Sequence, residues 1–192
     1  MRSVLRTMII LDPDLESDRS VKRSAAPIPR APSRDNRIPS ARALARFLHE
    51  AQAAAKLRGE VSVLLTTDNA IRRLNRQFRG KDKSTDVLSF PSYSPVPKDK
   101  AFDKLRTGSG GPRYRLPELA GDLAISVQAA RKQAAALGHA LAIEIKVLML
   151  HGLLHLAGYD HETDDGEMAR LEERLRAKLR LPHGLIERSL RA

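Results

Sequence analysis

Residues able to carry metal chemistry lie close together in one stretch of the sequence, HGLLHLAGYDH, which begins at His151. His155 follows four residues later, and Gly158 and His161 complete the pattern. This is the spacing of the extended zinc-protease motif H-E-x-x-H-x-x-G-x-x-H, whose glutamate takes a proton from metal-bound water. Gly152 stands at the position of that glutamate. The pattern therefore predicts a metal site and leaves its general base unassigned.

A helix over residues 141–157 would place the first two histidines correctly. It is apolar nearly all round, so we expect it to be the buried central helix. His151 and His155 are at i and i+4 and project from one face, one turn apart. Gly158 ends the helix with a positive φ, and the short return brings His161 to the same ion. Three protein ligands leave one position open, which is typical of a catalytic zinc site.

The alternative interpretation is that the two helical histidines are satisfied core residues and that the third lies on the surface. The glycine turn and the third histidine favour one bound divalent ion per chain, with zinc the expected metal. The other histidines, His49, His139 and His183, lack such partners and are interpreted as surface or cap residues. Asp160 either orients a ligand histidine or shapes the turn.

The charge of the chain is uneven. The formal net charge is +11, and residues 41–118 carry 16 basic and 8 acidic groups. The densest part is RRLNRQFRGKDK, whose cations are Arg72, Arg73, Arg76, Arg79, Lys81 and Lys83. Such a field suits a polyanion, most commonly nucleic acid. The alternative is a solvated basic helix face.

Length and composition indicate a globular chain. It has 192 residues, 42% of them hydrophobic, and no cysteine, so disulfides and thiolate metal sites are excluded. No run approaches the roughly 20 apolar residues of a membrane helix. The start, MRSVLRTMIILDPD, has too short an apolar run for a signal peptide. We expect a cytoplasmic protein that forms one domain over 1–192.

Hydrophobic periodicity predicts the elements that must position these residues. Strands are expected at 4–11, 61–65, 86–91 and 121–127, and helices at 40–59, 68–80, 126–137 and 141–157. A last helix, with Asp164 and Glu167 in a loose capping box, carries an apolar face of Met168, Leu171, Leu175 and Leu179.

Ser40 and Asp68 are the expected N-caps of the first two helices, and Ile71, Leu74 and Phe78 the apolar face of the second. Residues 12–39 are expected to form an irregular basic connection, and residues 92–117 a mobile insertion loop. Together the elements predict an α+β fold: a small mixed four-stranded sheet packed with about five helices around the central metal-binding helix.

Three segments, HGLLHLAGYDHETDDGEM, LNRQFRGKDKSTDVLSFP and GDLAIS, resemble the YbeY family of bacterial metal-dependent endoribonucleases. The resemblance runs from about Val61 to Leu181, and the 92–117 insertion matches poorly. It implies a zinc-like ion on the three histidines of the motif and a functional Arg79 at the active site.

The resemblance also implies a single-strand-specific endoribonuclease acting in ribosomal RNA processing, namely 3′ end maturation of the small-subunit RNA, and in ribosome quality control. Its implied partners are ribosomal RNA and the small ribosomal subunit with its proteins or assembly factors, with neither DNA nor a membrane involved. Arg79 would then clamp a phosphodiester, whereas its position alone suggests a helix-end arginine that complements the dipole. Lys81, Lys83, Arg72, Arg73 and Arg76 are the candidate RNA-binding residues.

Two other functions fit parts of the sequence. The ligand spacing suggests a metalloprotease-like hydrolase, although Gly152 counts against a protease. A non-catalytic ribosome-assembly factor with a structural metal is the third possibility, and the open coordination position argues against it. Asp86 and Ser84 are interpreted as turn or cap residues.

Overall fold

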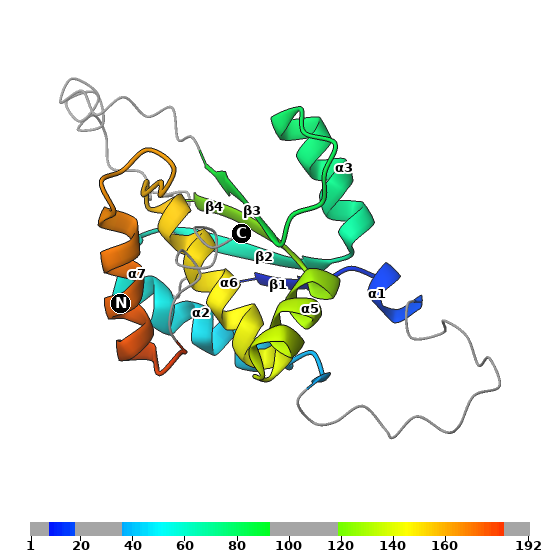
Figure 1. Ribbon diagram of the computed structural model, residues 1–192, viewed down its shortest axis with the longest axis horizontal. Helices are drawn as coiled ribbons and strands as arrows, with labels where there is room; N and C mark the ends of the chain where they lie inside the picture. The colour runs from blue at the N-terminus through cyan, green and yellow to red at the C-terminus, as the bar shows by residue number, and fades with distance from the viewer. Residues whose placement is uncertain (1–7, 18–35, 93–118, 183–192) are drawn as a thin grey trace, which may run out of the picture.

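The computed structural model describes residues 8–17, 36–92 and 119–182 (Figure 1). The elements, in chain order, are β1 (Met8–Leu11), α1 (Asp14–Ser17), α2 (Ala41–Ala55), β2 (Glu60–Thr66), α3 (Asp68–Arg79), β3 (Val87–Pro91), β4 (Leu119–Ser126), α5 (Val127–Leu137), α6 (Leu141–Leu156) and α7 (Glu167–Leu179). Several predicted segments lie outside the described residues. They are residues 4–7 of the first expected strand, residues 18–35 of the expected connection 12–39, nearly all of the expected insertion loop 92–117, and His183.

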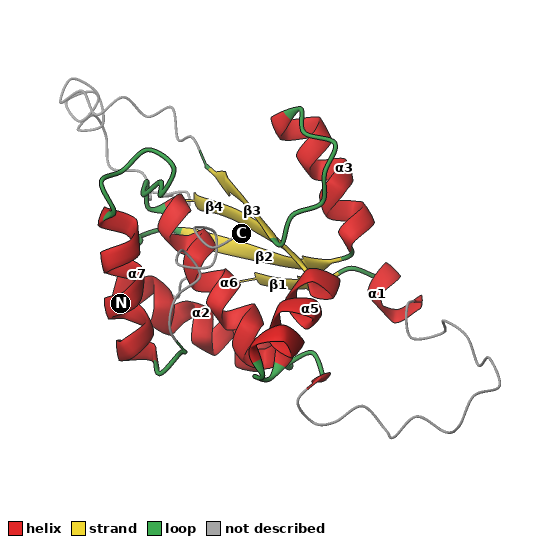
Figure 2. Cartoon of the chain, in the orientation of Figure 1, coloured by secondary structure: helices red, strands yellow, loops and turns green. Residues whose placement is uncertain are grey.

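The four strands form one mixed sheet in the order β1-β2-β4-β3 (Figure 2). β1 pairs with β2 and β2 with β4 in parallel, whereas β3 pairs with β4 antiparallel. The predicted α+β fold with a small mixed four-stranded sheet is confirmed. Within the described residues, β3 is an edge strand of this sheet.

The two faces of the sheet are covered by different helices, and strand β4 shows why. Its side chains alternate, so Leu123 and Ile125 enter the large core formed with α2, α5, α6 and α7. Ala124 points the other way and packs with Ile71 of α3 and Leu88 of β3. Figure 1 shows α3 on one side of the sheet and the other long helices on the opposite side. The basic helix α3 and the histidine-bearing helix α6 are therefore separated by the sheet.

Helix α6 is the central core helix, as its sequence predicted. It packs on β3 and β4 and is surrounded by α2, α5 and α7. Consecutive residues are fully buried, including Leu148, Met149, Leu150, Leu153 and Leu154. A helix buried on nearly all sides is rigid, and rigidity keeps the side chains at its end in a fixed geometry.

Helix ends follow local hydrogen bonding, with several corrections to the expected boundaries. Ser40 caps α2 as predicted, and its hydroxyl accepts from the Ala43 N–H. The helix ends at Ala55, with Lys56 in the left-handed conformation, and does not continue to Gly59. The cap of α3 is Thr67 and not Asp68, because the Thr67 hydroxyl accepts from the Ala70 N–H.

The expected capping box of the last helix is absent in that form. Helix α7 begins after Gly166, and the Asp164 carboxylate accepts from the N–H groups of Gly166 and Met168 at 2.8 Å each. Asp164 therefore satisfies a donor of the first turn from outside the helix. The expected irregular connection 12–39 also begins with one helical turn, α1.

Phe78 was predicted on the apolar face of α3, yet its side chain is 59% exposed. Ile71 of the same face is fully buried. The ring of Phe78 lies at the end of α3 and makes an edge contact with Phe90, with centroids 5.2 Å apart. Phe78 lies in the last turn of α3, whereas the buried cluster under this helix consists of Ile71, Leu88 and Ala124.

Gly121 of β4 lies at a position in the sheet where both the backbone conformation and the packing require glycine. It has a φ of +144°, and a Cβ there would lie 2.3 Å from the Phe90 carbonyl oxygen of the paired strand. We expect Gly121→Ala to lower the free energy of unfolding by about 3 kcal/mol or more, from backbone strain and overpacking together. Chemical denaturation measures this. The matched control is Gly138→Ala, where φ is +69° and nothing lies within 4 Å of the new Cβ. It should lose only about 1 kcal/mol, and equal losses would contradict the packing argument.

Candidate metal centre

The two histidines of α6 lie as the i, i+4 spacing predicted. Their Nε2 atoms are 3.2 Å apart. His161 joins them, and one ligand nitrogen from each of the three rings lies within 4.8 Å of the others. All three side chains are partly buried at the end of the central helix.

A sharp turn after α6 returns His161 to the end of the helix. Gly158 adopts a φ of +93°, and its N–H donates to the His155 carbonyl at 3.0 Å. Asp160 then shapes the next turn, because its carboxylate accepts from the Glu162 N–H at 3.1 Å and its carbonyl from the N–H groups of Thr163 and Asp164. That backbone hydrogen bond is the main reason why the pKa of Asp160 is lowered. These hydrogen bonds of Asp160 support the turn-shaping alternative.

The nitrogens of His151 and His155 have the separation expected for two ligands of a tetrahedral divalent ion. Two ligands about 2.1 Å from a tetrahedral zinc lie roughly 3.4 Å apart, close to the 3.2 Å between His151 and His155. Imidazole nitrogen is a donor that zinc accepts readily. Burial is the main cause that lowers the pKa of His155 to about 4, and the neighbouring His151 and His161 contribute to the same shift. His155 is therefore neutral at pH 7, which is the form that binds a metal.

Glu172 of α7 completes the centre, and the sequence analysis did not identify it. Its carboxylate accepts from His151 Nδ1 at 3.0 Å, which leaves the Nε2 lone pair facing the other rings. Burial opposes ionisation of Glu172, but His151 and Arg176 outweigh it and lower its pKa. Arg176 is 1% exposed and donates to Glu172 through Nε at 2.8 Å. A carboxylate behind a ligand histidine fixes the ring and its tautomer.

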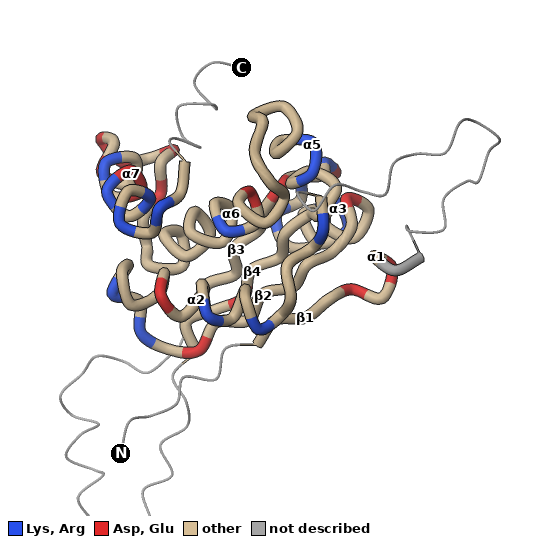
Figure 3. Tube along the Cα trace, turned by 90° about the horizontal axis from the view of Figure 1, so that it is seen from below, with Lys and Arg blue, Asp and Glu red and all other residues tan. Residues whose placement is uncertain are grey.

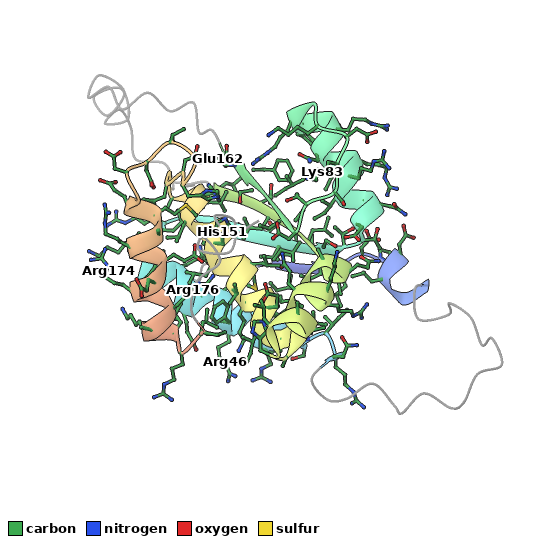
Figure 4. The ribbon with its side chains drawn as sticks, viewed as in Figure 1. Arg46, Lys83, His151, Glu162, Arg174 and Arg176 are labelled. Atoms are coloured by element: carbon green, nitrogen blue, oxygen red, sulfur yellow. The ribbon has the colours of Figure 1, made fainter. Side chains whose placement is uncertain are left out.

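A sequence signal for Glu172 existed. It lies four residues after Met168 and three before Leu175, on the predicted apolar face of the last helix. It is 2% exposed. An acidic residue at a core position needs a buried partner, and the two histidines predicted in the central helix could supply one. Figure 4 labels His151 on α6 and Arg176 on α7 beside it.

A cleft of about 480 Å³ opens above the three histidines, and Arg79 is one of its walls. We call it the histidine cleft; it is lined by His151, His155, His161, Arg79, Lys81 and Ser89 among others. The Arg79 guanidinium donates to the Ser89 carbonyl at 3.3 Å. Arg79 belongs to α3, on the opposite face of the sheet from α6, so it reaches the cleft past edge strand β3.

The other candidate RNA-binding cations separate into two groups. Lys81 lines the histidine cleft, and Lys83 lines a neighbouring cavity that also contains Arg79 and Lys81. Arg72, Arg73 and Arg76 line neither cavity. Arg72 is held by Asp82, with Nε and a terminal nitrogen each 2.8 Å from a carboxylate oxygen. The structure thus places only part of the basic segment at the centre.

Two other predicted surface or cap histidines lie away from the centre. His49 is exposed on α2. His139 is partly buried between α5 and α6, where its ring contacts the buried Glu144. Asp86, predicted as a turn or cap residue, accepts from the Val87 N–H at 2.8 Å at the start of β3. Ser84 lies in the loop before this strand and also lines the neighbouring cavity.

Gly152 faces the sheet, which explains why the protease glutamate has no place here. A Cβ at this position would lie 2.8 Å from Leu123 Cδ2 and 3.3 Å from Ser89 Oγ.

We expect Gly152→Glu to lower the free energy of unfolding by at least about 2 kcal/mol, through overpacking and a buried charge. It should also cleave no casein. Denaturation is compared with Ala135→Glu, at an exposed position of α5, which should change stability by less than about 0.5 kcal/mol. A stable Gly152→Glu variant that digests casein would contradict this reading.

Within the described residues, no single helix is long and apolar enough to cross a membrane; α5 and α6 reach that length only as a pair bent by 114°.

Comparison with known proteins identifies close relatives. A family model described as Endoribonuclease YbeY matches residues 33–180. The Endoribonuclease YbeY of Koribacter versatilis is 47% identical over 150 residues, covering 78% of this chain and 84% of the relative. That of Solibacter usitatus is 49% identical over 146 residues, covering 76% and 84%. Among solved structures, the solution structure of TM1509 from Thermotoga maritima is 26% identical, covers 74% of this chain and 85% of that chain, and has a TM-score of 0.46.

Proposed function

Because the chain belongs to the YbeY endoribonuclease family, we propose that it is a metal-dependent endoribonuclease that cuts single-stranded RNA during maturation of the 3′ end of small-subunit ribosomal RNA and during ribosome quality control. Its partners are then ribosomal RNA and the small subunit, and its compartment the cytoplasm. The observation that carries the proposal is the meeting of three histidines and Arg79 in one cleft.

The residues of the cleft fit a phosphodiester. Arg79, fixed by the Ser89 carbonyl, binds a non-bridging oxygen and stabilises the charge that develops there. Lys81 adds a second cation to the same cleft. His151, held by Glu172, and His155 and His161 would hold the divalent ion. When bound, zinc acts as a Lewis acid and makes water a stronger nucleophile at neutral pH.

The alternatives are weaker on structural grounds. A protease of the matching motif needs a carboxylate after the first histidine, and position 152 faces Leu123 and the sheet. A purely structural metal does not need an open cleft with two cations in it.

The test is incubation of the metal-loaded chain with a labelled precursor of small-subunit ribosomal RNA and, separately, with casein. We expect internal RNA cuts that a chelator stops and added zinc restores, and intact casein. The metal content is measured on the same samples. The ends of the products identify the nucleophile, since attack by the 2′-hydroxyl leaves a 2′,3′-cyclic phosphate and attack by water does not. Intact RNA with digested casein would reject the proposal in favour of a protease.

A further inference from the structure

A second cavity continues from the histidine cleft along the loop after α3. It has a volume of about 660 Å³ and lies between α3, α5 and the start of β3. We call it the side groove; it is lined by Lys83, Gln128, Lys132 and Gln133, which the histidine cleft lacks, among others. Arg79, Lys81 and Asp86 line both cavities. The two hollows therefore adjoin, and we treat them as one path that starts at the histidines.

Cations are spaced along this path. Arg79 and Lys81 stand where the two cavities join, and Lys83 and Lys132 lie further along. Both of these lysines are exposed. Figure 3 shows basic positions on α3 and α5, and Figure 4 labels Lys83 near α3. Lys132 belongs to α5, and the sequence analysis did not include it among the candidate RNA-binding residues.

The walls of the side groove are held in place by hydrogen bonds. The Asn75 amide donates to the Lys83 carbonyl at 2.7 Å, which fixes the loop that carries the lysine. The Gln133 amide donates to Asp86 at 2.9 Å and joins α5 to the start of β3. Three acidic residues, Asp68, Asp86 and Glu162, also line the groove. Ser126 donates to Asp68, and Val87 and Gln133 donate to Asp86. These donors offset part of the negative charge that would oppose an anionic ligand.

We propose that the side groove binds the phosphates of RNA nucleotides on one side of the cleaved bond. In this arrangement Arg79 contacts the scissile phosphate, and the strand continues past Lys81 to Lys83 and Lys132. The proposal rests on the proposed ribonuclease function. It differs from the expectation of the sequence, which put Arg72, Arg73 and Arg76 on the RNA track.

The test compares two variants that remove the same number of charges: Lys83→Gln/Lys132→Gln in the groove and Arg73→Gln/Arg76→Gln on the exposed face of α3. The metal-loaded full chain cleaves a labelled 12-nucleotide single-stranded RNA in single turnover at several KCl concentrations. The half-saturating protein concentration is plotted against salt on logarithmic axes. Each lost phosphate contact lowers the slope by ~0.7 for a single strand. The groove variant should therefore lose about 1.4 of the slope, with its maximal rate unchanged, and the α3 variant should keep the wild-type slope.

A dinucleotide substrate supplies an internal control, because it is too short to reach the lysines. The wild type and the groove variant should cleave it equally. An unchanged slope in the groove variant, or a loss confined to the α3 variant, would overturn the proposal while ribonuclease activity stands. If the wild type cuts no RNA, the proposed function fails. The slope is then read from fluorescence anisotropy of the same RNA, which still decides whether the groove binds it.

Discussion

Arg79→Ala is expected to reduce single-turnover cleavage of RNA by a factor on the order of 10²–10³, the usual effect of losing one donor to transition-state charge. The physical reason is the position of the guanidinium, which lines the histidine cleft and is fixed by the Ser89 carbonyl at 3.3 Å. No other arginine lines the cleft among the described residues, and the remaining cation, Lys81, lacks the planar fork of a guanidinium. The measurement is the cleavage rate of a labelled RNA at saturating enzyme.

Three controls separate this role from a structural one. Metal content and the circular dichroism spectrum should match the wild type, because the hydrogen bond of Arg79 goes to the Ser89 carbonyl and not to a ligand histidine. Arg46→Ala, on helix α2 beyond the central helix, removes the same charge and should leave the rate unchanged. Arg79→Lys should fall between wild type and alanine, since lysine keeps the charge but not the planar fork. A wild-type rate for Arg79→Ala would mean that the residue only complements the end of α3.

His155→Ala is expected to abolish stoichiometric metal binding and, with it, RNA cleavage. Wild type should carry about one divalent ion per chain. Loss of one of three ligands should weaken binding by more than ~100-fold, since even an outer partner of a ligand contributes 10–100-fold. Elemental analysis and competition with a zinc-binding dye measure this without depending on activity.

The matched control for His155→Ala is His49→Ala, the same change at an exposed position of α2. It should retain both the metal and the activity. Circular dichroism should show both variants folded, because His155 is only partly buried and the core around α6 is aliphatic. Equal metal in the wild type and in His155→Ala would remove the histidine centre from the mechanism.

Several features of this protein followed from short-range patterns in the sequence. The i, i+4 spacing sets His151 and His155 on one helix face, and a glycine with positive φ at 158 turns the chain back toward them. Strand alternation and apolar helical stripes predicted the mixed sheet and the buried central helix. These features depend on hydrogen bonds and side-chain directions within a few residues of the chain. Residue types and their spacing are therefore enough to predict them.

Other features were decided only by how distant elements pack. The sheet separates α3 from α6. Arg79 nevertheless lines the same cleft as histidines more than seventy positions away, because it lies at the end of α3, beside edge strand β3. Packing also leaves Phe78, predicted on the apolar face of α3, exposed. Gly152 points into Leu123 and not into the cleft, a direction that depends on how α6 rotates against the sheet.

The same reason explains the incomplete prediction of the site. Helix periodicity could show that Glu172 sits on an apolar face, but only the docking of α7 against α6 pairs it with His151. The sequence identified a basic segment, but it could not show that Lys81 and Lys83 line cavities and that Arg73 and Arg76 do not. Charge and spacing are local properties of the chain. Which of these cations line the cleft depends on tertiary packing, because the cleft forms where residues of α3 and α6, from opposite faces of the sheet, come together at edge strand β3.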